Sequence, residues 1–185
     1  MENVISTATG ASGALLANSR KAASETNQYL TFSLAGEMFA VGILNVKEII
    51  EYGDLTEIPM MPAFIRGVIN LRGAVVPVVD LSARFSGRST SVQKRTCNVI
   101  VEVRHEDSKH DIGIMVDAVS EVLEIQSADI EPPPAFGSRI RADFIAGMGK
   151  VGGKFVIILD IQRVLSADDL ATLAGVGKAD TAVTV

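Results

Sequence analysis

The sequence is poor in the residues on which several functional classes depend. Its 185 residues include one cysteine, two histidines, two tyrosines and no tryptophan, and aromatic residues make up 5% of the chain. A single cysteine excludes an intramolecular disulfide and any multi-cysteine metal site. So few aromatic side chains also argue against a base-stacking surface for single-stranded nucleic acid.

Positive charge and long apolar runs are scarce as well. The 17 Lys and Arg residues are outnumbered by 22 Asp and Glu residues, so the formal net charge is -5. Nucleic acids and anionic lipid surfaces favour a basic face, which this balance does not supply. The longest apolar runs, at residues 74–79 and 155–159, have the length of a strand and fall far short of a membrane span. We therefore expect a cytoplasmic protein that binds no nucleic acid and does not insert into a membrane.

The apolar content is nevertheless sufficient for a real core. Hydrophobic residues make up 48% of the chain and charged residues 21%, which is a globular composition. Residues 1–27 are rich in Ala, Ser, Thr and Gly and are predicted to form a flexible arm, and residues 175–185 a flexible tail. The folded domain is expected over residues 28–174.

Short strands separated by turn residues dominate that domain. Hairpins are predicted around residues 35–37, around residues 72–74 and at residues 97–116. Further strands are expected at residues 119–125 and 154–159. The pattern indicates a mostly β protein.

The helices are expected to be few and short. Asn45, followed three residues later by Glu48, matches a capping box and predicts a helix over residues 46–51. A last helix is predicted over residues 167–174, where Gly175 is expected to end it.

An internal repeat is the most informative pattern in the chain. When residues 64–86 are aligned with residues 144–166, seven of the 23 positions are identical, against roughly one or two expected from average composition. Asp80 and Asp160 follow a predicted strand in both copies and are expected to cap short helices. The repeat predicts two small barrels of about five strands each, divided near residues 94 and 95, with exchange of strands between the halves left open.

Residues that could carry catalysis are few. His105, His110 and Asp111 could chelate a divalent metal for hydrolysis, but they flank the polar tip of a predicted hairpin, where solvated side chains are expected. A metal-dependent hydrolase is therefore the weaker hypothesis, because a catalytic metal needs a supported ligand shell. Residues 147–152 match G-x-G-x-x-G but run into a strand, which indicates a hairpin turn and not a nucleotide site.

Surface residues are better candidates for binding. Two proline-bearing apolar segments end in Phe64 and Phe136, which could contact a partner or plug the barrels. Arg72 is predicted at a hairpin tip where the second copy has Gly152, so the fold itself does not require an arginine there. This asymmetry favours a contact or ion-pair role for Arg72, and Glu48 is one possible partner.

The central motif resembles a known family. Residues 62–80, PAFIRGVINLRGAVVPVVD, resemble the signature of the CheW-like chemotaxis coupling proteins. Residues 46–50, 113–122 and 147–160 match in the same order, so the resemblance covers about residues 28–174. It implies a mostly β fold of two five-stranded SH3/OB-like barrels around a shared apolar core, with short helices.

The same resemblance implies an adaptor with no catalytic activity and no cofactor. Proteins of this family link the cytoplasmic tips of chemoreceptors to the regulatory domain of the histidine kinase CheA, at receptor arrays near the inner membrane. Partner-binding roles would fall on Val46, Glu48, Gly67 and Arg72 in the first half, on Val116 and Val119 in the receptor groove, and on Phe136 at a second kinase contact. A coupler of another receptor–kinase pathway, such as surface motility, stays open.

Overall fold

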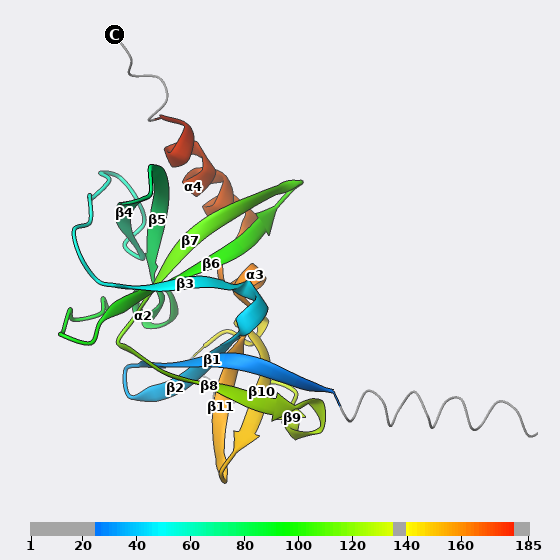
Figure 1. Cartoon of the computed structure of the whole chain (residues 1–185). Helices are drawn as coiled ribbons and strands as arrows, with labels where there is room; N and C mark the ends of the chain where they lie inside the picture. Colours follow the sequence, from blue (N-terminus) through cyan, green and yellow to red (C-terminus); the bar gives the residue numbers. More distant parts are fainter. Residues whose placement is uncertain (1–24, 135–139, 180–185) are drawn as a thin grey trace, which may run out of the picture.

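Two β-sheets face each other in the computed structural model, which describes residues 25–134 and 140–179 (Figure 1). The first sheet has the order β3-β6-β7-β5-β4 and the second the order β8-β1-β2-β11-β10-β9. The first comprises β3 (Val46–Glu51), β4 (Ile65–Leu71), β5 (Ala74–Asp80), β6 (Cys97–His105) and β7 (Ser108–Val116). The second comprises β1 (Thr26–Leu34), β2 (Glu37–Gly42), β8 (Ala118–Gln126), β9 (Ile130–Glu131), β10 (Ile145–Val151) and β11 (Lys154–Leu159).

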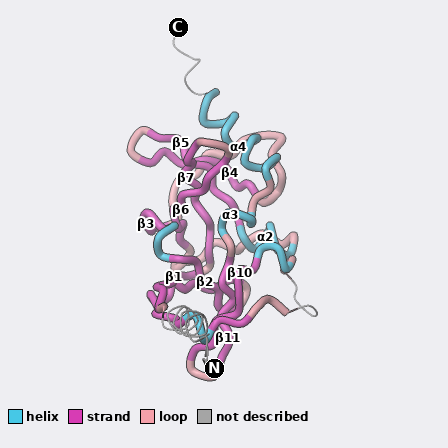
Figure 2. The backbone as a smooth tube through the Cα atoms, turned by 90° about the vertical axis from the view of Figure 1, so that its right-hand side faces the viewer, coloured by secondary structure: helices cyan, strands magenta, loops and turns pink. Residues whose placement is uncertain are grey.

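Helices connect the strands and cover the junction of the sheets. The α-helices are α2 (Leu81–Ser86), α3 (Ile161–Val164) and α4 (Ala167–Ala179), and the 3-10 turns are η1 (Ile43–Asn45), η2 (Ser127–Asp129) and η3 (Ala142–Phe144). Figure 2 shows α2 and α3 at the level where the sheets meet, with α4 beside the five-stranded sheet. The predicted mostly β class and the predicted hairpins are confirmed.

The two sheets have matching strand arrangements. Strands β3, β6, β7, β5 and β4 of the first sheet correspond in order to β8, β1, β2, β11 and β10 of the second. Both copies contain one parallel pair, β5 with β7 and β11 with β2. The backbone N–H groups of Asp80 and Asp160 donate to the carbonyls of Phe64 (2.7 Å) and Phe144 (2.9 Å). The two copies therefore share backbone geometry as well as sequence.

Each sheet closes into a small barrel in the same way. The chain leaving β3 returns at Thr56, which forms an isolated bridge with Val68 of β4. The chain leaving β8 returns as β9, which pairs with β10. Each barrel interior has its own apolar cluster, around Ile100 and Met115 in the first barrel and around Ile125 and Ile158 in the second.

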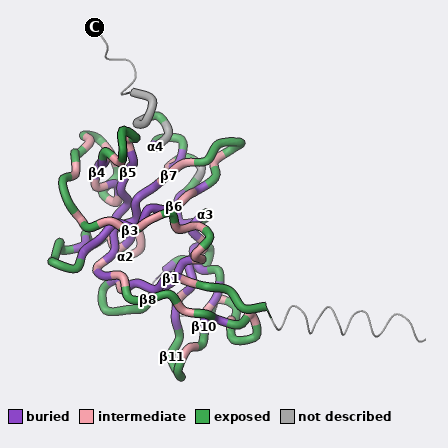
Figure 3. Tube along the Cα trace, viewed as in Figure 1, coloured by how far each residue is buried: buried purple, intermediate pink, exposed green. Residues whose placement is uncertain are grey.

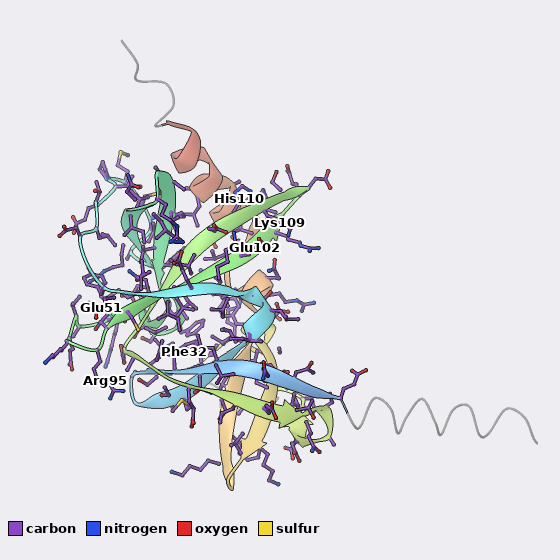
Figure 4. All side chains as sticks on the ribbon, viewed as in Figure 1. Phe32, Glu51, Arg95, Glu102, Lys109 and His110 are labelled. Carbon is purple, nitrogen blue, oxygen red and sulfur yellow. The ribbon has the colours of Figure 1, made fainter. Side chains whose placement is uncertain are left out.

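The largest apolar cluster lies between the two sheets. It contains buried residues from both sheets and from the helices, so one core is shared by both barrels (Figure 3). Figure 4 shows Phe32 in this space, and its ring begins a chain of contacts through Phe39 and Phe85 to Phe144. The predicted architecture of two barrels around a shared core is confirmed, with β9 as an additional strand of the second sheet.

The five-stranded sheet is made from the middle of the chain. It takes all its strands from residues 46–116, whereas the six-stranded sheet combines residues 26–42 with residues 118–159. The division expected near residues 94 and 95 falls just before β6, inside the stretch that forms the five-stranded sheet. Each sheet therefore contains strands from both halves of the chain.

The prediction of a helix over residues 46–51 is wrong, because this segment forms strand β3. Asn45 ends the 3-10 turn η1 and makes no capping box with Glu48. Val46, Ile49 and Ile50 are β-branched residues that favour a strand, and β3 pairs with β6 along its length. Pairing with a distant strand thus overrides a local helix signal.

The prediction that the last helix ends at Gly175 is also wrong, because α4 continues to Ala179. A glycine ends a helix when it takes up the left-handed conformation after the last turn. Gly175 does not have a positive φ, so it weakens the helix without ending it. The capping of the preceding helices is as predicted: Asp80 accepts from Ala83 N and Asp160 from Gln162 N.

Candidate functional site

The tip of the β4–β5 hairpin is the first part of the site. Arg72 has φ 52° and Gly73 has φ 86°, and the corresponding Gly152 and Gly153 have φ 56° and 77°. The two hairpins thus make the same left-handed turn, in which a non-glycine residue costs about 1 kcal/mol. The first copy keeps an arginine where glycine would be more stable.

The guanidinium of Arg72 reaches back to β3. Its Nη1 lies 3.3 Å from Oε2 of Glu48, and its Nη2 donates to the other carboxylate oxygen. The Arg72 side chain remains 73% exposed in this arrangement, against 27% for Glu48. Because β3 and β4 are the two outer strands of the sheet, the ion pair spans the seam of the first barrel. Such an exposed pair adds less than about 1 kcal/mol to stability.

Gly67 closes the same seam from inside. It is buried with φ 148°, and a Cβ atom at this position would lie 2.2 Å from the carbonyl oxygen of Thr56. That close approach lets Thr56 and Val68 exchange backbone hydrogen bonds of 2.9 and 2.8 Å. Gly147 of the second copy is similarly crowded by Ile130 of β9, at 2.5 Å. Gly67 therefore holds the two edges of the first barrel together beneath the surface that carries Arg72.

The three predicted valines lie at the junction of the barrels. Val46 of β3 and Val119 of β8 are partly buried and pack against the central core, on the outer strands of the two sheets. Val116 is fully buried in that core, so it shapes the junction and offers no surface of its own. Exposed apolar side chains lie on the neighbouring elements: Met38 (39%), Leu44 (97%), Ile49 (44%) and Val122 (47%).

The two candidate phenylalanines differ in what the structure shows of them. Phe64 packs against the central core, and the guanidinium of Arg84 lies 4.7 Å from its ring centre. Its role is therefore to hold α2 against the junction. Phe136 lies outside the described residues, and its predicted partner contact stays a prediction.

A cluster of ion pairs at the far end of the first barrel was missed by the sequence analysis. Lys47 Nζ lies 2.8 Å from Asp111 and 3.6 Å from Glu102, and Lys109 Nζ lies 2.9 Å from the other oxygen of Glu102. Figure 4 shows Glu102, Lys109 and His110 along this end of β6 and β7. The predicted β6–β7 hairpin places Glu102 opposite Asp111. Two like charges directly opposite each other destabilise a strand pair unless a cation lies between them. This pairing was the signal in the sequence from which the cluster could have been predicted.

Hydrogen bonding shifts the pKa values within this cluster. The hydrogen bond to Asp111 is the largest cause that raises the pKa of Lys47. The hydrogen bond from Lys109 is the largest cause that lowers the pKa of Glu102. Both shifts favour the charged forms, so the cluster is a balanced ionic network across β3, β6 and β7.

The residues considered for a metal site lie at the β6–β7 hairpin tip. The rings of His105 and His110 are 6.4 Å apart, and Asp111 is paired with Lys47. Within residues 25–134 and 140–179, no three His, Cys, Asp or Glu side chains gather as a metal site would require. Cys97 is buried, and burial raises the pKa of its thiol. None of the helices that the structure describes is long and apolar enough to cross a membrane.

Comparison with known proteins agrees with this geometry. The family model of the CheW-like domain matches residues 28–169. The chemotaxis protein CheW of Klebsiella aerogenes is 34% identical over 165 residues, which cover 88% of this chain and 97% of the relative. The protein of the same name from Treponema pallidum is 33% identical over 81% of this chain and 88% of the relative.

A solved structure supports the same assignment. The scaffolding protein TtCheW from Thermoanaerobacter tengcongensis matches with a TM-score of 0.69 and 36% sequence identity, over 77% of this chain and 89% of that chain. The sequence motif, the two-barrel fold and the relatives agree over most of the described residues. The chain belongs to the CheW-like family.

Proposed function

We propose that this protein is a non-enzymatic adaptor that couples chemoreceptors to a CheA-type histidine kinase. Its relatives are named chemotaxis proteins, and its solved neighbour is named a scaffolding protein. The observation that carries the proposal is Arg72, an exposed arginine in a left-handed turn that adds little to stability. An exposed residue that the fold does not require is a good candidate for contact with a partner protein.

The surface around Arg72 and Glu48 would bind the regulatory domain of the kinase. Glu48 holds the guanidinium in place, which reduces the side-chain entropy lost on binding. A preoriented arginine retains donors for a second acceptor on the partner. Gly67 keeps β4 close to Thr56 beneath this surface, and the three residues would act as one unit.

The junction near Val46 and Val119 would receive the tip of the receptor. Both valines are partly buried on the central core, and exposed Leu44 and Val122 extend the apolar surface around them. An amphipathic receptor helix could bury its apolar side here. Val116 would support this surface from within the core, and Phe136 would form a second kinase contact.

Simultaneous occupation of two surfaces would explain how an adaptor without catalysis can work. Two linked contacts raise the effective concentration of each partner, so modest pairwise affinities suffice for a stable receptor array. The protein would then act in the cytoplasm at arrays close to the membrane that holds the receptors.

The test of the kinase surface is a charge reversal with a matched control. Arg72→Asp should weaken association with the regulatory domain of the cognate kinase at least tenfold in calorimetry. Arg163→Asp removes an arginine of similar exposure (69%) that pairs with Asp160, and it should leave the affinity unchanged. Both variants should keep the thermal midpoint of the wild type. Equal affinities for Arg72→Asp and wild type would contradict the assignment.

The receptor surface is tested independently. Val119→Asp should reduce co-sedimentation with receptor signalling tips while kinase binding persists. Loss of both interactions together with a lower thermal midpoint would indicate damage to the core instead of a binding surface.

A further inference from the structure

Met60 is a fully exposed apolar side chain in the connection between β3 and β4. The exposed fraction of this residue is 102%, whereas most other large apolar side chains of the described residues are buried or half-buried. Figure 3 shows much of this connection as exposed. The thioether sulfur of Met60 is therefore accessible to small molecules in solution.

The backbone of Met60 adopts a conformation that methionine disfavours. Its φ is 64°, in the left-handed region, which costs about 1 kcal/mol for a residue with a Cβ atom. The other non-glycine residues of the described chain with positive φ are Ala35, Arg72 and Glu106, and all three lie in hairpin turns. The turn at Met60 joins no hairpin. Neither packing nor backbone preference explains a methionine at this position.

Contacts on both sides of Met60 hold the turn in place. Before it, Thr56 and Val68 exchange backbone hydrogen bonds of 2.9 and 2.8 Å. After it, Met61 and Phe64 pack against the central core. The outward position of Met60 is thus a property of the fold, and a reagent reaches its sulfur without any local unfolding.

The other methionines that the structure describes have less accessible sulfur atoms. Met115 is fully buried in the first barrel, and Met61 and Met148 are partly buried against the central core. Met38 is 39% exposed, but Ser120 Oγ lies 3.9 Å from its Sδ atom and donates a hydrogen bond to it. This bond engages a lone pair of the sulfur, which slows attack of that lone pair on an oxidant.

We propose that Met60 is a site of reversible oxidation by hydrogen peroxide. The sulfur lone pair attacks one peroxide oxygen, an S–O bond forms and the O–O bond breaks, and the other oxygen takes up the proton and leaves as water. The sulfur is oxidised by two electrons to the sulfoxide while the peroxide is reduced. Hydrogen peroxide is uncharged, so the net charge of -5 on the chain does not repel it.

A reductase with a pair of thiols reverses the modification. The sulfoxide oxygen leaves as water, the two thiols form a disulfide, and the sulfur regains two electrons. An exposed turn gives such an enzyme direct access to the Met60 side chain, whereas a sulfoxide inside the core is reached only after unfolding.

Oxidation of Met60 changes the surface of the protein and not its fold. A sulfoxide inside a core is destabilising, because a polar group is buried there. At Met60 the added oxygen lies in solvent, and no packing contact is lost. The turn therefore changes from apolar to polar while the seam between Thr56 and Val68 stays closed. The inference does not depend on the proposed function, because it concerns the reactivity of one side chain.

The experiment treats the full chain with limiting hydrogen peroxide and follows each methionine by peptide mass spectrometry, with fragment ions to separate Met60 from Met61. Met60 should gain one oxygen at least tenfold faster than Met115, which is oxidised only through opening of the barrel. Met60→Leu should remove this fast reaction. Met38→Leu is the matched control at another exposed methionine, and it should leave the fast reaction unchanged.

Two further measurements test the ranking and the reversal. Ser120→Ala frees the sulfur of Met38, so it should speed oxidation of Met38 without changing the rate at Met60. Protein oxidised at Met60 alone should keep the thermal midpoint of the wild type. Methionine sulfoxide reductases of both epimer specificities, with a dithiol as reductant, should restore its original mass.

Three results would overturn the proposal. Faster oxidation of Met38 or Met115 than of Met60 would show that exposure does not select the site. A thermal midpoint that falls in step with oxidation of Met60 would show that this sulfur supports the fold. A Met60 sulfoxide that the reductases leave unchanged, although they reduce free methionine sulfoxide, would make the oxidation irreversible damage.

Discussion

Single residues of the β4–β5 hairpin allow the first barrel to close and determine which charged group its surface exposes. Gly67 closes the seam because a side chain there would occupy the space of the Thr56 carbonyl. Arg72 exposes its guanidinium at the hairpin tip, and its left-handed backbone conformation costs stability. Asp80, at the end of the hairpin, is fully buried and accepts hydrogen bonds from Ala83 and Thr90. Buried residues that hold the barrel together and an exposed charged residue thus alternate along one short segment.

Gly67→Ala should destabilise the protein far more than Gly73→Ala. Both glycines have positive φ, but a Cβ at Gly73 would meet nothing within 4 Å, whereas at Gly67 it would clash with Thr56. Backbone strain alone predicts a loss of about 1 kcal/mol at Gly73. Strain with overpacking predicts roughly 2–4 kcal/mol at Gly67. Chemical denaturation measures both, and equal losses would show that the Thr56 contact is unimportant.

Asp80→Asn and Asp160→Asn should also differ, although both residues cap a helix. Asparagine caps a helix as well as aspartate does, so the partly exposed cap at Asp160 should lose little stability. Both carboxylate oxygens of Asp80 accept hydrogen bonds, and one lies 3.7 Å from Arg66. An amide would present a donor to Thr90, for a loss of roughly 2–4 kcal/mol. Thermal unfolding of the two variants is the measurement, and similar midpoints would argue against this reading.

At the scale of elements, contacts between distant segments decide what local signals leave open. β3 carries a helix-capping pattern but pairs with β6, and the pairing determines its structure. α4 continues through Gly175, while its start is held by reciprocal hydrogen bonds between Ser166 and Asp169. Arg84 of α2 also pairs with Asp169 and donates to the carbonyl of Val164. The helix is thereby tied to the opposite copy of the repeat.

The ionic network across β3, β6 and β7 should give stability a dependence on acidic pH. The pKa of Glu102 is lowered from its ordinary value of 4.5 in the folded protein. Its contribution is therefore present above about pH 4.5 and is lost as pH falls through the lowered pKa. Glu102→Gln should flatten the acid side of the stability curve. Glu106→Gln, at the tip of the same hairpin, serves as the control, and identical curves for Glu102→Gln and wild type would exclude the network as the cause.

At the scale of the molecule, the two barrels are interdependent. The six-stranded sheet joins the hairpin of β1 and β2 to strands from residues 118–159. Both sheets contribute to one central cluster. Neither half of the chain contains all the strands of a barrel, so the repeat in sequence does not correspond to two independent folding units.

Separated halves of the chain should not fold. Fragments 1–94 and 95–185 are each expected to lack cooperative thermal unfolding by circular dichroism, because each leaves half of both barrels without partners. Mixing the fragments is expected to restore part of the native signal. Cooperative unfolding of either fragment alone would contradict the interdependence of the barrels.

Several features could be predicted from the sequence because they depend on local residue patterns. These are the β class, the hairpins, the repeat and the helix caps at Asp80 and Asp160. Turns and caps depend on residues within a few positions of each other, so the residue types suffice to predict them. The position of Arg72 at a hairpin tip was predictable for the same reason. Its asymmetry with Gly152 was the sequence signal for the proposed partner-binding role, and the structure shows that the Arg72 side chain is exposed.

The sequence by itself determined which short segments form turns, hairpins and capped helices, and that two copies of one unit are present. Only the tertiary structure decided that residues 46–51 form a strand, that each sheet combines strands from both halves of the chain, and that Glu102 lies between two lysines. It also decided that Met60 is fully exposed while Met61 beside it packs against the central core. Pairing across tens of residues is selected by the energy of the whole core and not by local preference, and this is why those features could not be predicted.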